Sequence, residues 1–200
     1  MMNKNIKSRR SFFSKMLIAG VSGVALFSET AYARGRKGKK DKKGGGSKVQ
    51  LTKAQKDKLF FIYQEEKLAR DVYITLGKLY PDENTFATIQ HSEQRHIDAA
   101  QGLCETYKID ISEVNESEVG NFVLPVMQTL YDNLVEQGNE TLYDALEVGI
   151  YIEELDIEDL REAIEEMNMP SDVINVYGNL REGSYNHLEA FQGAVSRASR

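Results

Sequence analysis

Residues 92–96 read "SEQRH", in which Glu93 and His96 stand three residues apart. On a helix this spacing places a carboxylate and an imidazole on the same side. Residues 184–188 read "SYNHL", with His187 at the corresponding place and a serine where the acidic residue would stand. The two segments therefore raise the question whether both histidines belong to one metal site shared by two helices.

The chain around these segments is predicted to be all-α. It has only three prolines, each at a natural break, and its apolar residues recur every three to four positions. The expected helices span about residues 52–80, 84–107, 125–137, 140–167 and 171–197. Ser171, directly after Pro170, is expected to be the N-cap of the last one. Four long amphipathic helices and one extra short helix predict a four-helix bundle.

Each long helix carries one stripe at the spacing that faces a bundle core, and each stripe is apolar at both ends and polar in the middle. The polar residues are Glu66 on the first long helix, Glu93 and His96 on the second, Glu153 and Asp156 on the third, and Ser184 and His187 on the fourth. A carboxylate buried alone costs several kcal/mol or becomes neutral through a shifted pKa. These stripes therefore predict a compensating metal ion or metal pair in the core.

Carboxylates and imidazoles suit iron or manganese, and zinc is also possible, so we expect one or two such ions. Helical di-iron proteins take one Glu from each of two helices and Glu-x-x-His from each of the other two. The residues that match this pattern are Glu66, Glu93, His96, Glu153 and His187. Ser184 leaves the pattern one ligand short, which predicts one tightly bound metal and one loose or absent metal.

Several neighbours of these ligands are open to more than one interpretation. The third long helix is better threaded through Glu153 than through Glu154, because the second stripe would bury an Arg and a further Glu. Asp156 is a substitute ligand, a partner of a ligand histidine, or a sign that this helix is rotated. Glu65 points away from the stripe and is predicted to be solvated, as is His91.

Tyr73 and Tyr177 lie one or two turns from the ligands, and with Ser184 they are expected just outside them. The two phenols either hydrogen-bond to the ligands, take part in proton or radical transfer, or pack in the core with a satisfied hydroxyl. Gly183 lies inside the last helix, where it lowers helix stability by about 1 kcal/mol relative to alanine. We expect it there because it permits close approach of another helix.

The first 33 residues are predicted to be an export signal. "KNIKSRRSFFSK" is basic and contains Arg9 and Arg10, and "MLIAGVSGVALF" is apolar but too short to span a bilayer. Residues 31–33 read "AYA", a small-x-small cleavage site. The segment resembles a bacterial twin-arginine signal, with a plain secretory signal as the alternative. The resemblance implies a periplasmic or otherwise exported protein that is carried across the membrane folded, often with its cofactor already inserted.

Charge divides the rest of the chain. Residues 34–48 carry eight positive charges and one negative charge among glycines, so this linker is predicted to be disordered. The linker suits an anionic surface as a partner, or it is a soluble spacer. From residue 49 onward, 12 Lys and Arg stand against 29 Asp and Glu, which argues against nucleic acid as a partner of the folded domain 49–200. Its single cysteine, Cys104, rules out an internal disulfide.

Four segments together carry a family resemblance. "EKLARDVY" resembles the first-helix signature of rubrerythrin-type proteins, Glu-x-x-Ala-Arg-x-x-Tyr. With "SEQRH", "VGIYIEELDI" and "GSYNHLEAF" it is similar to the ferritin-like family DUF2202 over about residues 55–197. The resemblance implies a ferritin-like four-helix bundle with a metal site, and often a homodimer. It implies no established reaction.

Two functions follow from this reading. The first is an exported carboxylate-bridged metal oxidoreductase that reacts with oxygen or peroxide, or oxidises ferrous ion. It would take electrons from a partner protein, because the chain has no Cys-x-x-Cys pair for a rubredoxin-like domain. The second is a non-catalytic metal-binding or structural envelope protein, in which Ser184 marks a degenerate metal site. The number of metal ions per chain distinguishes the two.

Overall fold

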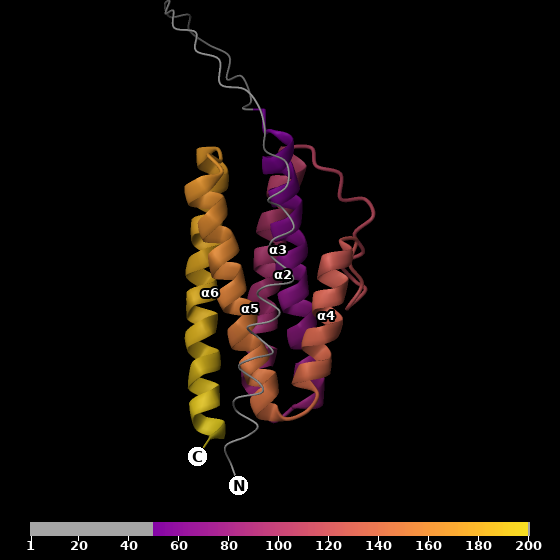
Figure 1. Ribbon diagram of the computed structural model, residues 1–200, viewed down its shortest axis with the longest axis vertical. Helices are drawn as coiled ribbons and strands as arrows, with labels where there is room; N and C mark the ends of the chain where they lie inside the picture. Colours follow the sequence, from indigo (N-terminus) through magenta and orange to yellow (C-terminus); the bar gives the residue numbers. More distant parts are fainter. Residues whose placement is uncertain (1–49, 200) are drawn as a thin grey trace, which may run out of the picture. The chain divides into compact units, whose positions relative to one another are not determined.

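The computed structural model describes residues 50–199, which form a bundle of five α-helices with no strand among them (Figure 1). The helices are α2 (Lys53–Leu79), α3 (Asn84–Thr106), α4 (Pro125–Gly138), α5 (Leu142–Glu166) and α6 (Ser171–Ala198). The all-α prediction is confirmed, and each bound lies within two residues of the expected one. The predicted export signal (residues 1–33) and basic linker (34–48) lie outside the described residues.

Local signals at the helix ends explain these bounds. α2 begins at a capping box, in which the Thr52 hydroxyl accepts from the Gln55 N–H at 3.2 Å and the Gln55 side chain accepts from the Thr52 N–H at 2.8 Å. The prediction that Ser171 caps α6 is wrong, because Pro170 is the N-cap residue and Ser171 is already helical. The proline ring fixes φ, here at −58°, so the chain turns into the helix one residue earlier.

The four long helices pack as two antiparallel pairs. α2 packs along α3 and α5 packs along α6, and the pairs meet where α2 faces α5 and α3 faces α6 (Figure 1). The short helix α4 lies outside this group, against α2 and α5. The interior is therefore lined by one face of each of the four long helices, which are the four that carry the predicted stripes.

The predicted stripes face this interior, and their middle residues are buried together with their apolar ends. One end of the interior is filled by apolar side chains that are mostly aliphatic but include Tyr63 and Tyr177. The other holds three aromatic rings, in which the Phe191 centroid lies 5.0 Å from that of Tyr73 and 5.5 Å from that of Phe86. Between residues 50 and 199, no helix combines the length and the apolar character needed to span a membrane.

α2 is more deeply buried than its amphipathic pattern predicts, since every residue from 62 to 73 is buried. Its outer side is covered by the segment 107–124, which three charged residues hold in place. We call them the loop clamp: Lys67, Arg70 and Asp71. Lys67 Nζ donates to two backbone carbonyls of the segment at 2.9 and 3.1 Å, and Arg70 donates to a third at 2.7 Å. The clamp thereby turns an exposed helix face into a buried one.

Candidate metal centre

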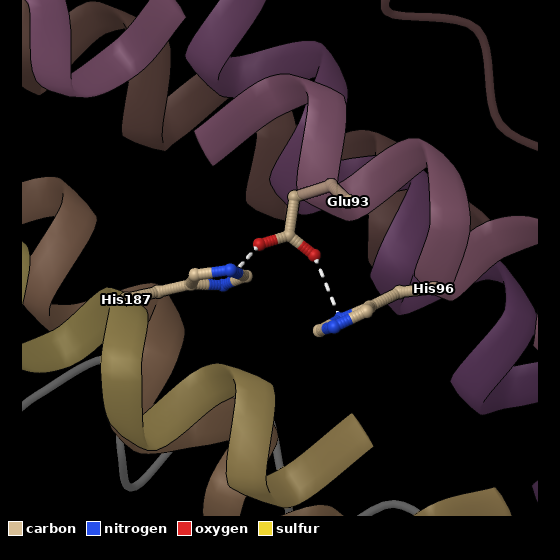
Figure 2. Close-up of side chains that lie close together, drawn as sticks. All are labelled: Glu93, His96 and His187. Carbon is tan, nitrogen blue, oxygen red and sulfur yellow. Dashed lines mark ion pairs between the residues drawn. The ribbon is translucent and has the colours of Figure 1, made fainter. Parts of the chain in front are cut away.

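Glu93 faces both predicted histidines, as Figure 2 shows. Its Oε2 lies 3.1 Å from Nδ1 of His96, and its Oε1 lies 2.7 Å from Nδ1 of His187. Glu93 and His96 come from α3 and His187 comes from α6, so the contact joins the two helix pairs. One ligand atom from each of the three residues lies within 4.8 Å of the other two. This buried group could therefore hold a metal ion.

Two more of the predicted carboxylates flank the histidines. Oε2 of Glu66, on α2, lies 3.1 Å from Nδ1 of His96, and Oε2 of Glu153, on α5, lies 3.5 Å from Nδ1 of His187. The two imidazole rings are stacked, with centroids 5.3 Å apart and 27° between their planes. Each histidine thus has one carboxylate of its own and shares Glu93. We call these five residues the central cluster.

Asp156 and Ser184 are bonded to each other beside the central cluster. The Ser184 hydroxyl donates to Oδ2 of Asp156 and also contacts the Leu180 carbonyl at 3.1 Å. Oδ1 of Asp156 is buried and has no hydrogen-bond partner among residues 50–199. α5 is not rotated, since Glu153 and Asp156 are both buried, and Asp156 accepts its hydrogen bond from a serine rather than from a histidine. The free oxygen leaves the substitute-ligand interpretation open.

The register of α5 is the preferred one, because Glu153 is buried and Glu154 is exposed. The Tyr73 hydroxyl donates to Oε1 of Glu153 at 2.6 Å, which leaves Oε2 of that carboxylate directed at His187. The Tyr177 hydroxyl is buried without a hydrogen-bond partner in the described part of the chain. Of the two predicted phenols, therefore, only Tyr73 contacts a ligand, and the expectation of a satisfied hydroxyl is wrong for Tyr177.

Gly183 makes room for one of the histidines. A Cβ atom at this position would lie 2.5 Å from Nε2 of His96, closer than any side chain tolerates. The expected close approach at Gly183 is therefore made by a side chain, the imidazole of His96, because the three atoms nearest to that position all belong to this ring. Glycine lowers the stability of α6, but a larger residue at position 183 would displace His96 from its place between α3 and α6.

The prediction that Glu65 is solvated is wrong. The residue is 2% exposed, and neither of its carboxylate oxygens has a hydrogen-bond partner among the described residues. Burial, followed by the charges of Asp159 and Asp156 on α5, raises the pKa of Glu65 well above its usual value. The sequence carries no signal for this, because Glu65 lies off the inner stripe and meets these aspartates only when α5 packs against α2.

Burial and charge distribute the protons of the central cluster unevenly. Burial raises the pKa values of Glu66 and Glu153 to about 7. Burial would also raise the pKa of Glu93, but its contacts with His187 and His96 lower it to about 2. Burial acts to lower the histidine pKa values, yet the carboxylates outweigh it and raise them to about 11 for His96 and about 10 for His187. Without metal, both imidazoles are therefore protonated at neutral pH.

The donor atoms fit a divalent metal ion. Deprotonated imidazole nitrogens and carboxylates are ligands that iron, manganese and zinc accept. Oε1 of Glu66 and Oδ1 of Asp156 are buried acceptors without a donor in the described residues. Such an atom costs free energy unless a proton or a cation satisfies it. A metal ion would displace the histidine protons and supply the missing positive charge.

Comparison with known proteins places the chain in a family. The model of an uncharacterized protein domain, DUF2202, matches residues 55–199. The uncharacterized protein MJ0754 of Methanocaldococcus jannaschii is 42% identical over 144 residues, which are 72% of this chain and 76% of that protein. The crystal structure of the hypothetical protein MJ0754 from Methanococcus jannaschii is similar with a TM-score of 0.72 at 38% identity, over 78% of this chain and 87% of that chain. Because the family model spans most of its length, the chain belongs to the DUF2202 family.

Proposed function

We propose that this protein is a ferritin-like metal protein that binds one or two ions of iron or manganese at the central cluster, with zinc as a further possibility. The observation that carries the proposal is the position of Glu93, which directs one oxygen at each of two histidines. Glu93 would then be a ligand common to both halves of the site. Glu66, beside His96, and Glu153, beside His187, would each add a carboxylate to one half.

Asp156 is the proposed substitute for the carboxylate that Ser184 does not provide. It is buried, it has one unpaired oxygen, and its pKa is raised well above the usual value, first by burial and next by the charge of Glu66. With Asp156 the site has four carboxylates and two imidazoles, whose four negative charges match two divalent ions. Because Ser184 already donates to Asp156, we expect one ion to be held more weakly than the other.

The proposed activity is reduction of oxygen or peroxide, with electrons that come either from a partner protein or from ferrous ion that is itself oxidised. The metal would supply redox chemistry and Lewis acidity. The residues of the chain would bind and orient it: Glu93 joins the halves, Tyr73 fixes the direction of Glu153, and Gly183 seats His96. The apolar ends of the interior would keep bulk water from the site.

Metal content of the exported protein, purified from its host and measured by mass spectrometry, tests the binding proposal. Wild type should carry one to two ions per chain, and Glu93→Gln should lose them because both halves share this residue. The matched control is Glu154→Gln, which changes an exposed carboxylate on the same helix as Glu153. Equal metal content in wild type and Glu93→Gln would contradict the proposal.

A non-catalytic metal-binding or structural role is the second candidate. It is favoured by Ser184, which occupies the position of the missing ligand and donates a hydrogen bond to one oxygen of Asp156, the proposed substitute. Peroxide consumption with ascorbate as reductant separates the two candidates. An oxidoreductase should consume peroxide faster than Glu93→Gln does in the presence of the same amount of iron. A non-catalytic protein should not exceed that variant.

Export is proposed from the sequence of the first 33 residues alone. The charge of the twin-arginine-like segment and the "AYA" site at residues 31–33 support cleavage after Ala33. Mass spectrometry of the exported protein should then find Arg34 as its first residue. A mature chain that begins at Met1 would rule this proposal out without affecting the metal site.

A further inference from the structure

The central cluster has two halves that share Glu93, and the two halves differ in geometry. In the His96 half, Oε2 of Glu66 and Oε2 of Glu93 each lie 3.1 Å from Nδ1 of His96. In the His187 half, Oε1 of Glu93 lies 2.7 Å from Nδ1 of His187, whereas Oε2 of Glu153 lies 3.5 Å from it. The His187 half therefore holds its own carboxylate less closely than the shared one.

The helices that supply the two halves also differ. Glu66 lies on α2 and both Glu93 and His96 lie on α3, so one helix pair supplies every residue of the His96 half. The His187 half takes Glu153 from α5 and His187 from α6, but it depends on Glu93 from the other pair. A change in the distance between the pairs would therefore alter the His187 half and leave the His96 half intact.

Hydroxyl groups engage carboxylate oxygens on α5 but not the carboxylate on α2. Tyr73, which is fully buried, donates to Oε1 of Glu153 at 2.6 Å. Ser184 donates to Oδ2 of Asp156 in the same way. Glu66 accepts from no hydroxyl of the described residues, and its Oε1 is buried without any partner there. Glu66 can thus offer two oxygens to an ion, whereas Glu153 can offer one.

The acidic residue that the family pattern lacks belongs to the His187 half. Ser184 stands three residues before His187, just as Glu93 stands three residues before His96. The serine hydroxyl carries no charge, and it also contacts the Leu180 carbonyl at 3.1 Å. His187 consequently has no carboxylate from its own helix and depends on those of α3 and α5.

We propose that the two halves hold metal ions differently: the His96 half retains its ion, and the His187 half binds an ion that exchanges with solution. This inference rests on the proposed function of the central cluster. It assigns a divalent metal ion as the substrate class of the His187 half, because a substrate has to enter and leave its site. The ion of the His96 half is then a permanent part of the protein.

Tyr73 is a positioning residue in this arrangement. Its ring centroid lies 5.0 Å from that of Phe191 and 6.3 Å from that of Phe86, so the phenol is held in place by packing. Packing accounts for the ring but not for the direction of the hydroxyl. The hydroxyl lies 2.6 Å from Oε1 of Glu153 and 3.5 Å from the Gly149 carbonyl, so the carboxylate is its main acceptor.

Release of Co²⁺ to a chelator tests the assignment. The exported protein is made metal-free, reloaded with Co²⁺ and mixed with excess EDTA, and visible absorption follows the loss of the ion. Wild type should release its metal in two phases whose rates differ by roughly tenfold or more, which is the usual size of effect for groups that contact metal ligands. Glu153→Gln should lack the fast phase, Glu66→Gln should lack the slow phase, and Glu154→Gln should match wild type.

Tyr73→Phe separates positioning from packing. The change keeps the ring and frees Oε1 of Glu153 for the ion, so the fast phase should slow by roughly tenfold while the slow phase keeps its rate. Packing alone requires only the ring. A fast phase that is unchanged or faster in this variant would therefore overturn the part assigned to Tyr73.

Loss of the fast phase in Glu66→Gln, or of the slow phase in Glu153→Gln, would overturn the assignment while leaving the metal site intact. If wild type retains a single ion, that ion has to depend on Glu66 and not on Glu153 for the assignment to stand. If wild type binds no Co²⁺ at all, the proposed function fails as well. His96→Asn and His187→Asn keep the test decisive if a glutamine variant does not fold, because each removes the imidazole of one half.

Discussion

One stretch of α2, "EEKLARD" at residues 65–71, holds two groups of buried charge with opposite surroundings. The loop clamp is complete: Lys67 donates to Asp71 at 2.5 Å and to two carbonyls, and Arg70 donates to Asp71, to Gln94 and to a third carbonyl. Glu65 and Glu66, one turn away or less, retain three carboxylate oxygens without a hydrogen-bond partner among the described residues.

The difference separates charge that stabilises the fold from charge that serves a site. The charged groups of the loop clamp find their partners within the chain. The free-energy cost of removing them from water is therefore offset by their ion pairs and by their hydrogen bonds to the segment 107–124. The central cluster has three carboxylates and two histidines. Burial raises the pKa values of Glu66 and Glu153 to about 7, so the fold stabilises the negative charge of these two residues only in part. What the second group lacks is positive charge, which only protons or a metal can bring.

The largest predicted effect concerns the loop clamp. Asp71→Ala leaves Lys67 and Arg70 buried without their shared carboxylate, and should lower the free energy of unfolding by about 3–5 kcal/mol. Glu66→Gln in the metal-free protein should lower it less, because Oε1 of Glu66 has no hydrogen-bond partner among the described residues and only Oε2 contacts His96. Urea denaturation of both variants measures the difference. Similar losses in the two variants would erase the distinction between the groups.

Metal binding should produce the next largest effect. A ligand that binds only the folded state stabilises it by about 2.7 kcal/mol at a hundredfold excess over its dissociation constant. Addition of Mn²⁺ should therefore raise the melting temperature of wild type, and a chelator should reverse the shift. Glu93→Gln should show no shift, whereas Glu154→Gln should respond as wild type does. A shift in Glu93→Gln equal to that of wild type would place the ion elsewhere.

The sequence predicts the central cluster better than its surroundings, for a physical reason. The helical period fixes which side chains face a common interior, so Glu66, Glu93 and His187 are identifiable before any packing is known. Their ligand role is a hypothesis for the metal measurements to decide. The register of α5 also follows from the sequence, because an alternative face with Arg161 and a second Glu makes a poor interior.

The burial of the loop clamp and of Glu65 could not be predicted in this way. Lys67, Arg70 and Glu65 lie off the inner stripe of α2, where an isolated amphipathic helix is solvated. They become interior only because the segment 107–124 covers one side of α2 and α5 covers another. Those contacts join residues far apart in the chain, and no periodicity within one helix records them.

The pH dependence of the metal-free protein should follow its raised pKa values. Glu66 and Glu153 titrate near 7 instead of 4.5, and both histidines titrate at about 10 to 11 instead of 6.5. The folded state therefore binds more protons than the unfolded state between about pH 5 and 9, so stability falls as pH rises through this range. The slope should be up to about 1.4 kcal/mol per pH unit for each such proton.

Denaturation midpoints at pH 5, 7 and 9, with and without Mn²⁺, measure this dependence. Bound metal replaces the protons of the central cluster, so the loaded protein should lose less stability toward pH 9. The lowered pKa of Glu93 acts in the opposite direction but only below about pH 4.5, outside this range. Stability of the metal-free protein that rises between pH 5 and 9 would contradict the assigned protonation states.

The smallest predicted effect concerns Ser184, which is fully buried. Ser184→Ala removes one hydrogen bond to Asp156, which should cost about 1 kcal/mol in the metal-free protein. If Asp156 is the substitute ligand, this change frees its second oxygen, and metal content should stay the same or rise. Asp156→Asn should instead lower metal content toward one ion per chain, because the site then loses its fourth carboxylate. Metal analysis of both variants decides the point: equal content in Asp156→Asn and wild type would leave the serine and the aspartate as a packing pair beside the site.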